Sequence, residues 1–224
     1  MRFLFIPGSC HGPWCWRDVL PFFNNAHAID LPHGPDATLA AHATAIAEHL
    51  PEPTILVGHS AGGFAITAAA EAAPDRVAGL IHVCAYVPRD GESLAQMRRA
   101  WPDRPLSGSY NVNADRTLFS FDPARIDALF YHDCPAEARA LAHAHLRPEP
   151  IRPQETALSL RHSPHLPRAY IRCTEDRAIP PAFQSAMASG LPQIDLPSSH
   201  SPFFSMPERL AQAIHRLAKP MTRG

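Results

Sequence analysis

The sequence predicts an α/β protein in which helices flank a mostly parallel central sheet and a helical insertion interrupts the pattern. Short apolar runs alternate with helical stretches in both outer parts of the chain. One of these runs meets a helix through a serine flanked by glycines, and the middle of the chain loses the alternation. Because an order of strand, helix and strand leaves room for crossover connections, it favours a parallel sheet over hairpins.

The first half of the chain gives the clearest elements. A strand over 3–6 ends at a Pro-Gly pair, a short helix follows over 16–23, and a second strand over 26–30 closes in a loop rich in proline and glycine. A helix over 39–50 has Thr38 as its N-cap. The buried strand over 55–57 then leads into a helix over 64–73, which stops at Pro74.

The later elements complete the same pattern. We expect strands over 77–83, 168–173 and 192–196, and a terminal helix over 207–217. Between them, residues 88–167 form polar segments punctuated by proline, with short helices over 123–130 and 136–145. Apolar periodicity at Ile126, Leu129 and Phe130 indicates that this insertion packs on something. We interpret the chain as one domain, 1–224, with 88–167 as a cap over the active site; the alternative is an extension that only widens the fold.

Composition bounds the class of protein. The chain has 224 residues with 46% hydrophobic content, enough for a large core. A net charge of -1 gives no electrostatic reason to expect nucleic acid or an anionic membrane as a partner. The apolar run near the N-terminus is too short for a signal peptide or a membrane span, so we expect a cytoplasmic protein. The scattered cysteines fit reduced, buried thiols: Cys10, Cys15, Cys84, Cys134 and Cys173.

The most informative stretch is Gly58-His59-Ser60-Ala61-Gly62, which joins the strand over 55–57 to an alanine-rich helix. A turn this sharp brings the strand and the helix so close that side chains at Gly58 and Gly62 would clash. It would also lift the Ser60 hydroxyl clear of the sheet. We therefore predict that Ser60 is a nucleophile.

A serine nucleophile needs a base within hydrogen-bond reach and a carboxylate that orients the base. Asp176 lies in the loop beyond the strand over 168–173, at the carboxyl end where open parallel sheets place their sites. Glu175 is the neighbour most easily confused with it. His200 follows the last strand, on a loop before the terminal helix. The order serine, aspartate, histidine, each after a parallel strand, singles out His200 from the 14 histidines.

Four motifs carry a resemblance to a known family: the run Gly8–Trp16, the serine turn, the stretch 175–184, and His200. Together they resemble the α/β-hydrolase superfamily, and within it the branch of plant hydroxynitrile lyases and methyl-salicylate and methyl-jasmonate esterases. The resemblance implies a catalytic Ser60, Asp176 and His200, with an oxyanion hole made by the backbone N–H groups of Ser9 and Ala61.

Within that branch the sequence favours the esterases. The lyases resemble one another in a threonine two residues after the first strand and a lysine directly after the catalytic histidine. Here these positions hold Gly8 and Ser201, and the single lysine, Lys219, lies in the terminal stretch. We expect hydrolysis of a small-to-medium carboxylic ester through an acyl-enzyme on Ser60. A lyase without the lysine, lactone or amide hydrolysis, perhydrolysis, and a small-molecule receptor on the same fold stay open.

The remaining expectations concern the pocket and the partners. We expect an apolar substrate pocket lined by Gly8, His11, Tyr86, Phe121, Tyr131 and Phe203. The expected mechanism uses no metal and no organic cofactor, and the histidines of the insertion lack metal-binding spacing. A small-molecule ester is the expected partner, with neither nucleic acid nor membrane. The resemblance leaves a homodimer as a possible assembly.

Overall fold

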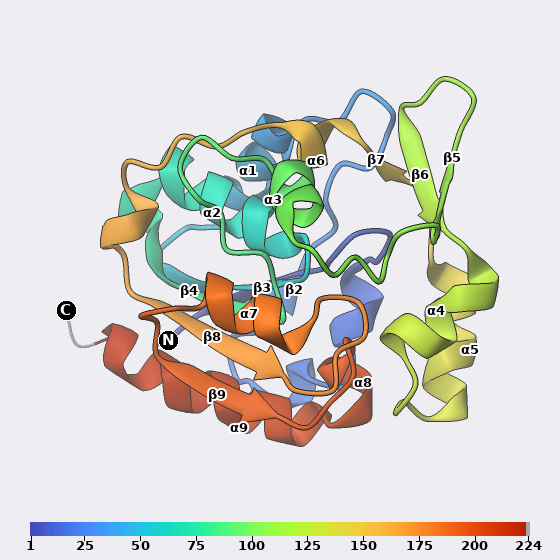
Figure 1. The fold of residues 1–224 in the computed structure, drawn as a ribbon. Coiled ribbons are helices and arrows are strands. Elements are labelled where there is room, and N and C mark those ends of the chain that lie inside the picture. Colours follow the sequence, from blue (N-terminus) through green and yellow to red (C-terminus); the bar gives the residue numbers. More distant parts are fainter. Residues whose placement is uncertain (223–224) are drawn as a thin grey trace.

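The computed structural model describes residues 1–222 and contains a six-stranded sheet in the order β2-β1-β3-β4-β8-β9 (Figure 1). Every neighbouring pair in this sheet is parallel, as the sequence predicts. The strands are β1 (Phe3–Ile6), β2 (Ala26–Ala28), β3 (Thr54–His59), β4 (Val77–Val83), β8 (Arg168–Cys173) and β9 (Gln193–Leu196).

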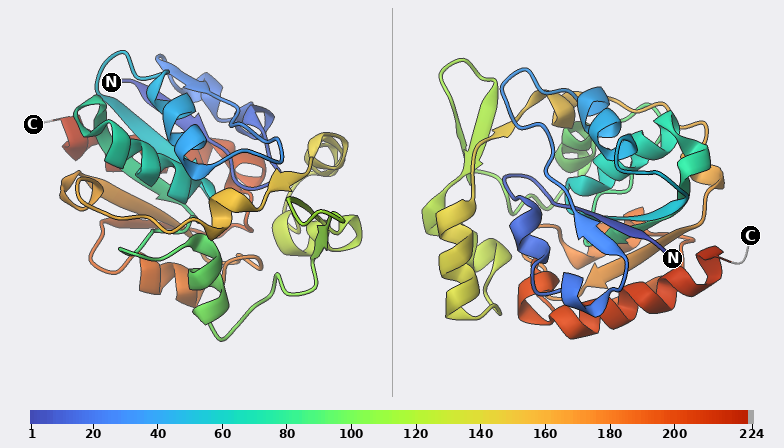
Figure 2. Two further views of the ribbon diagram at one scale, coloured as in Figure 1. Left: turned by 90° about the horizontal axis from the view of Figure 1, so that it is seen from above. Right: turned by 180° about the vertical axis from the view of Figure 1, so that it is seen from behind.

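Alternating side chains place the two faces of this sheet in separate cores. Phe3 and Phe5 of β1 belong to a cluster with Leu210 and Ile214 of the terminal helix, whereas Leu4 and Ile6 pack with residues of the first two helices. Side chains of a strand point to opposite faces in turn, so one buried strand serves both layers. Figure 2 shows the sheet lying between these helical layers.

The helices predicted outside the insertion form in the predicted order, with one difference, and two helices that were not predicted are added, over 181–187 and 202–205. The short helix predicted over 16–23 is observed as two separate turns of 3-10 helix, η1 (Pro13–Trp16) and η2 (Leu20–Phe22). The helix is not continuous over this stretch, because Pro21 has no backbone N–H to donate within it. The α-helices outside the insertion are α1 (Leu39–Ala47), α2 (Gly62–Ala72), α7 (Pro181–Met187), α8 (Pro202–Ser205) and α9 (Pro207–Ala218). The Thr38 hydroxyl accepts the Ala41 N–H at 3.0 Å, which confirms the predicted cap.

The segment between β4 and β8 contains more structure than the sequence indicates. Its helices are α3 (Leu94–Ala100), α4 (Pro123–Phe130), α5 (Ala136–His145) and α6 (Arg152–Glu155), of which α4 and α5 match the prediction. A three-stranded antiparallel sheet was missed: β5 (Tyr110–Val112), β6 (Leu118–Phe121) and β7 (Glu149–Pro150). Figure 1 shows β5, β6, α4 and α5 on the side toward which the arrowheads of β8 and β9 point.

Two further observations bear on the sequence expectations. No helix in the described residues is long and apolar enough to cross a bilayer. All five cysteines are buried free thiols, as their scattered spacing predicts.

Close packing at the start of α2 gives a stability prediction. A Cβ added to Gly63 would lie 2.1 Å from the Tyr86 carbonyl oxygen, whereas a Cβ on Gly34 would meet no atom within 4 Å. We expect Gly63→Ala to lower the free energy of unfolding by about 3 kcal/mol, because backbone must shift to admit the methyl group. Gly34→Ala, the control, should change it by less than about 0.5 kcal/mol. Urea denaturation measures both, and equal effects would contradict the packing described.

Candidate active site

Ser60 stands on a strained turn between β3 and α2. Its φ of 52° lies in the left-handed region, which a serine adopts only when its surroundings hold it there. A Cβ on Gly58 would lie 2.8 Å from the Gly62 carbonyl oxygen, and one on Gly62 would lie 2.7 Å from that of Pro7. Both glycines are therefore required by close backbone approach, for the reason the sequence suggests.

His200 and Asp176 form a buried pair. The Nδ1–H of His200 donates to Asp176 Oδ2 at 2.7 Å. Since Nδ1 carries the proton in this bond, the lone pair of the neutral ring lies on Nε2, where a base must act. The pair joins the loop after β8 to the loop after β9, so neighbouring parallel strands bring together residues 24 positions apart.

Three further donors hold the Asp176 carboxylate. Its Oδ1 accepts the backbone N–H groups of Ala178 at 2.7 Å and Ile179 at 2.9 Å. Its Oδ2 also accepts the Gln184 amide at 2.9 Å. Glu175, the competing candidate, is exposed, and it is its backbone carbonyl that accepts a hydrogen bond, from His132. The structure thus places Asp176, and not Glu175, against His200.

A second histidine, which the sequence analysis missed, supports the first. His59 Nε2–H donates to the His200 carbonyl oxygen at 2.8 Å, and the Cys84 thiol donates to the same oxygen at 3.4 Å. Burial holds the pKa of His59 well below its usual range, so this ring stays neutral. The ligand atoms of His59, Cys84 and His200 lie within 4.8 Å of one another, a spacing compatible with a metal. Their hydrogen bonds instead make His59 and Cys84 supports for the His200 main chain.

Ser60 and His200 line one narrow cavity. Its other lining residues come from the first loop, from the end of β3 and the turn after it, from the loop after β4, and from the insertion: Ser9, His11, His59, Ala61, Tyr86, Leu94, Arg98, Leu106, Tyr110, Phe119, Phe121, Phe130 and Gln154. The space open to a water-sized molecule is about 20 Å³. In the described part of the chain, no hydrogen bond joins Ser60 Oγ to His200 Nε2.

The predicted pocket residues divide into three groups. His11, Tyr86 and Phe121 line the cavity with Ser60, and Gly8 lines an adjoining hollow that shares Ser9 and His11 with it. Tyr131 and Phe203 are instead core residues behind the cavity, each 0% exposed. The Tyr131 hydroxyl donates to His11 Nε2 at 2.6 Å, and the Phe203 ring lies edge-on to His59. The sequence shows only that these two residues are aromatic, which does not tell whether they line the cavity or lie in the core behind it.

The predicted oxyanion donors lie beside the cavity. Ser9 and Ala61 both line it, and within residues 1–222 neither backbone N–H has a protein acceptor. Buried N–H groups are paired in most proteins, so two open donors near a nucleophile are the arrangement that an oxyanion requires.

A family model for α/β hydrolases matches residues 3–213. The chain belongs to the α/β-hydrolase family. The protein is therefore an enzyme of the hydrolase class.

Named relatives extend over nearly the whole chain. Methyl jasmonate esterase 1 of Vitis vinifera is 26% identical, covering 97% of this chain and 97% of the relative. The pyrethroid hydrolase of Sphingobium wenxiniae is 30% identical, covering 94% of this chain and 85% of the relative. The crystal structure of a pyrethroid hydrolase from Sphingobium faniae superposes with a TM-score of 0.87 at 26% identity, covering 98% of this chain and 97% of that one.

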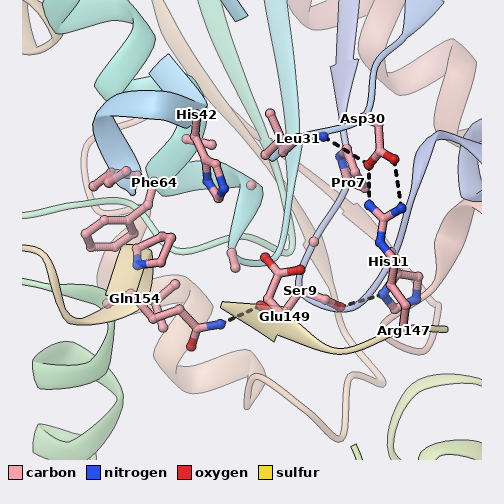
Figure 3. Close-up of a pocket in the computed structure, with 17 residues that line it drawn as sticks. Pro7, Ser9, His11, Asp30, Leu31, His42, Phe64, Arg147, Glu149 and Gln154 are labelled. Carbon is pink, nitrogen blue, oxygen red and sulfur yellow. Dashed lines mark hydrogen bonds and ion pairs between the residues drawn. The ribbon is translucent and has the colours of Figure 1, made fainter. Parts of the chain in front are cut away.

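Three side chains immobilise the first loop of this α/β hydrolase, and Figure 3 shows two of them, Gln154 and His11, hydrogen-bonded to Ser9. Gln154 donates to Ser9 Oγ at 2.8 Å, and His11 Nδ1–H donates to the Ser9 carbonyl oxygen at 2.8 Å. Burial lowers the pKa of His11 to about 4, so its ring is neutral and its Nε2 accepts the hydrogen bond from Tyr131. Glu149, at the start of β7, accepts the Cys10 N–H at 3.2 Å. The loop that carries Ser9 is thus held by residues of the insertion.

Glu149 gives a prediction about pH. Burial raises its pKa from the ordinary 4.5 to about 7, against the Cys10 N–H and the Arg147 guanidinium, which lower it. Between pH 4.5 and 7 the folded protein therefore keeps a proton on Glu149 that the unfolded chain has released. The free energy of unfolding consequently falls as pH rises through this range. We expect the unfolding free energy of Glu149→Gln, relative to the native protein, to increase over that range by about 3 kcal/mol.

Urea denaturation at pH 5 and pH 8 measures this change. Glu155→Gln is the matched control, because Glu155 is an exposed carboxylate a few residues along the same segment. The free energy of unfolding of Glu155→Gln should differ from that of the native protein by the same amount at both pH values. If Glu149→Gln also differs by the same amount at both pH values, Glu149 has the same pKa in the folded and unfolded chains and the prediction is wrong.

Proposed function

We propose that this α/β hydrolase is a serine carboxylesterase that cleaves a small-to-medium ester through an acyl-enzyme on Ser60. The observation that carries the proposal is the buried His200–Asp176 pair, oriented with Nε2 as the free ring nitrogen, beside a cavity shared with Ser60. The names of the relatives, methyl jasmonate esterase and pyrethroid hydrolase, support ester hydrolysis as the reaction class.

The proposed mechanism assigns one task to each group. His200 Nε2 removes the proton of Ser60 Oγ as the oxygen attacks the ester carbonyl, and Asp176 stabilises the imidazolium that forms. The N–H groups of Ser9 and Ala61 bind the oxyanion. His200 then protonates the departing alcohol, and water hydrolyses the acyl-enzyme by the same steps. The bond between Ser60 and His200 forms when substrate closes the site, as catalytic hydrogen bonds often tighten only in the complex.

We infer that residues 88–167 act as the cap of this site. The insertion supplies Leu106, Tyr110, Phe119, Phe121 and Phe130 to the cavity wall. Because the open space beside Ser60 is so small, entry of an ester requires side chains of this segment to move. An extension that only widened the fold would not line the cavity.

The position after His200 argues for an esterase over a lyase. Ser201 is buried and is not among the residues that line the cavity shared by Ser60 and His200, so a side chain at this position does not face a leaving group there. A Cβ on Gly8 would lie 2.7 Å from the Ser60 Cβ, which excludes a threonine there without rearrangement. Release of cyanide from mandelonitrile at a rate above that of ester hydrolysis would overturn this preference.

The nucleophile is tested with p-nitrophenyl acetate and butyrate. We expect turnover by the native protein, an initial burst of p-nitrophenol, and a loss of at least about 10³-fold in kcat in Ser60→Ala. Ser159→Ala, which truncates an exposed serine of the insertion, is the control and should retain native activity. Undiminished turnover by Ser60→Ala would place the nucleophile elsewhere, and binding without turnover by the native protein would favour a receptor.

The orienting carboxylate is tested by a pair of neighbouring acids. Asp176→Asn puts an amide NH₂ where the carboxylate accepts four hydrogen bonds, so His200 loses its tautomer and orientation. We expect kcat to fall by about 10⁴-fold. Glu175→Gln makes the same chemical change on an exposed side chain and should leave kcat within about twofold. The reverse result would make Glu175 the orienting acid.

A further inference from the structure

The cavity lined by Ser60 and His200, here called the catalytic cavity, has one arginine in its wall, Arg98 in the last turn of α3. Among the described residues that line it there is no lysine, aspartate or glutamate. Every other lining side chain is apolar, aromatic or a neutral polar group, apart from the histidines already described. Arg98 thus places a positive charge at the wall of the catalytic cavity, and the proposed mechanism does not use that charge. Its presence there requires a separate explanation.

Neutral partners hold this guanidinium. Arg98 Nη1 donates to the Tyr110 hydroxyl at 2.8 Å and to Gln154 Oε1 at 3.4 Å, and its Cζ lies 4.8 Å from the Tyr110 ring centroid. No carboxylate of residues 1–222 forms an ion pair with Arg98, and its Nε and Nη2 have no protein acceptor there. A half-buried cation without a counter-ion has lost hydration that an incoming anion can replace.

A larger chamber adjoins the catalytic cavity at Arg98. It shares Tyr86, Arg98, Leu106 and Tyr110 with the catalytic cavity, and about 220 Å³ of it is open to a water-sized molecule. Arg99, Arg104 and Asp103 also line it; with Arg98, three arginines and one aspartate give a formal charge of +2.

Most of the remaining lining of that chamber is apolar and partly aromatic. Trp101 and Phe183 stack at 4.5 Å between centroids with an interplanar angle of 10°, and Ile179 and Pro180 lie beside them. Such walls suit a flat apolar group, whereas the arginines suit an anion. The planar fork of a guanidinium binds a carboxylate through two parallel hydrogen bonds.

We propose that Arg98 binds a carboxylate of the substrate, so that the preferred substrates are esters carrying a second, ionised carboxyl group. This inference rests on the proposed esterase activity and specifies its substrate class. The ester lies at Ser60, the carboxylate meets Nε and Nη2 of Arg98, and apolar parts of the molecule extend into the adjoining chamber.

The test compares esters that differ only in charge. Monomethyl terephthalate and methyl 4-carbamoylbenzoate carry the carboxylate or its neutral amide on the acyl side; 4-carboxyphenyl acetate and 4-carbamoylphenyl acetate carry it on the alcohol side. We expect the native protein to favour the anionic member of at least one pair by about tenfold in kcat/KM, chiefly through KM. The pair that shows the preference locates the carboxylate.

Variants separate recognition from structural support. Arg98→Gln should reduce the preference to less than about twofold, and Arg98→Lys, which keeps the charge without the fork, should retain an intermediate preference. Arg209→Gln removes an exposed arginine of α9 and should keep the native preference. If Arg98→Gln instead lowers both members of a pair equally, Arg98 only supports Gln154 and Tyr110 and the inference is overturned.

Binding to Ser60→Ala distinguishes failure of this inference from failure of the proposed function. Calorimetry with the same pairs needs no turnover, so tighter binding of the anionic member supports Arg98 as the carboxylate site even if ester hydrolysis is absent. Equal binding of both members, or tighter binding of the amides, contradicts it whether or not p-nitrophenyl acetate is hydrolysed. If Arg98→Gln fails to fold, judged by circular dichroism, the native and Arg98→Lys preferences decide the outcome.

Discussion

The hydrogen bond between His200 and Asp176 is the interaction on which the rest of the site depends. It fixes the ring nitrogen that carries the proton and leaves the other free to act as a base. Asp176 is in turn held by two backbone N–H groups and the Gln184 amide, and the His200 carbonyl is held by His59 and Cys84. A buried pair surrounded by fixed donors needs little rearrangement when charge develops on the imidazole.

The need to place Ser60 beside the His200–Asp176 pair explains the close packing around the turn that carries Ser60. Ser60 must leave β3 at the height of the loops that follow β8 and β9, so the chain reverses sharply between the strand and α2. Around this turn, an added Cβ on Gly8, Gly58, Gly62 or Gly63 would lie within 2.9 Å of a neighbouring atom. The strained backbone conformation of Ser60 is maintained because the surrounding packing is rigid.

The sequence predicts those features that local pattern determines. Apolar runs locate the strands of the main sheet, and the order of Ser60, Asp176 and His200 along it follows from the parallel topology. It does not predict β5, β6 and β7, which have two to four residues each and lie among the polar, proline-punctuated segments of the insertion. His59, Gln184 and Glu149 were missed for another reason: each acts through a partner distant in sequence or in another element. Tyr131 and Phe203 were predicted to line the pocket but lie in the core behind it. The sequence does not show this difference, because it depends on tertiary packing.

The central claim is that Ser60, His200 and Asp176 act as one unit beside two backbone donors. A crystal structure of the protein after reaction with a phosphonate that mimics the tetrahedral intermediate tests it most directly. The account predicts phosphorus bonded to Ser60 Oγ, a phosphonyl oxygen about 3 Å from the Ser9 and Ala61 nitrogens, and an intact His200–Asp176 bond. Phosphorus on another residue, or an imidazole turned away from Ser60, would contradict it.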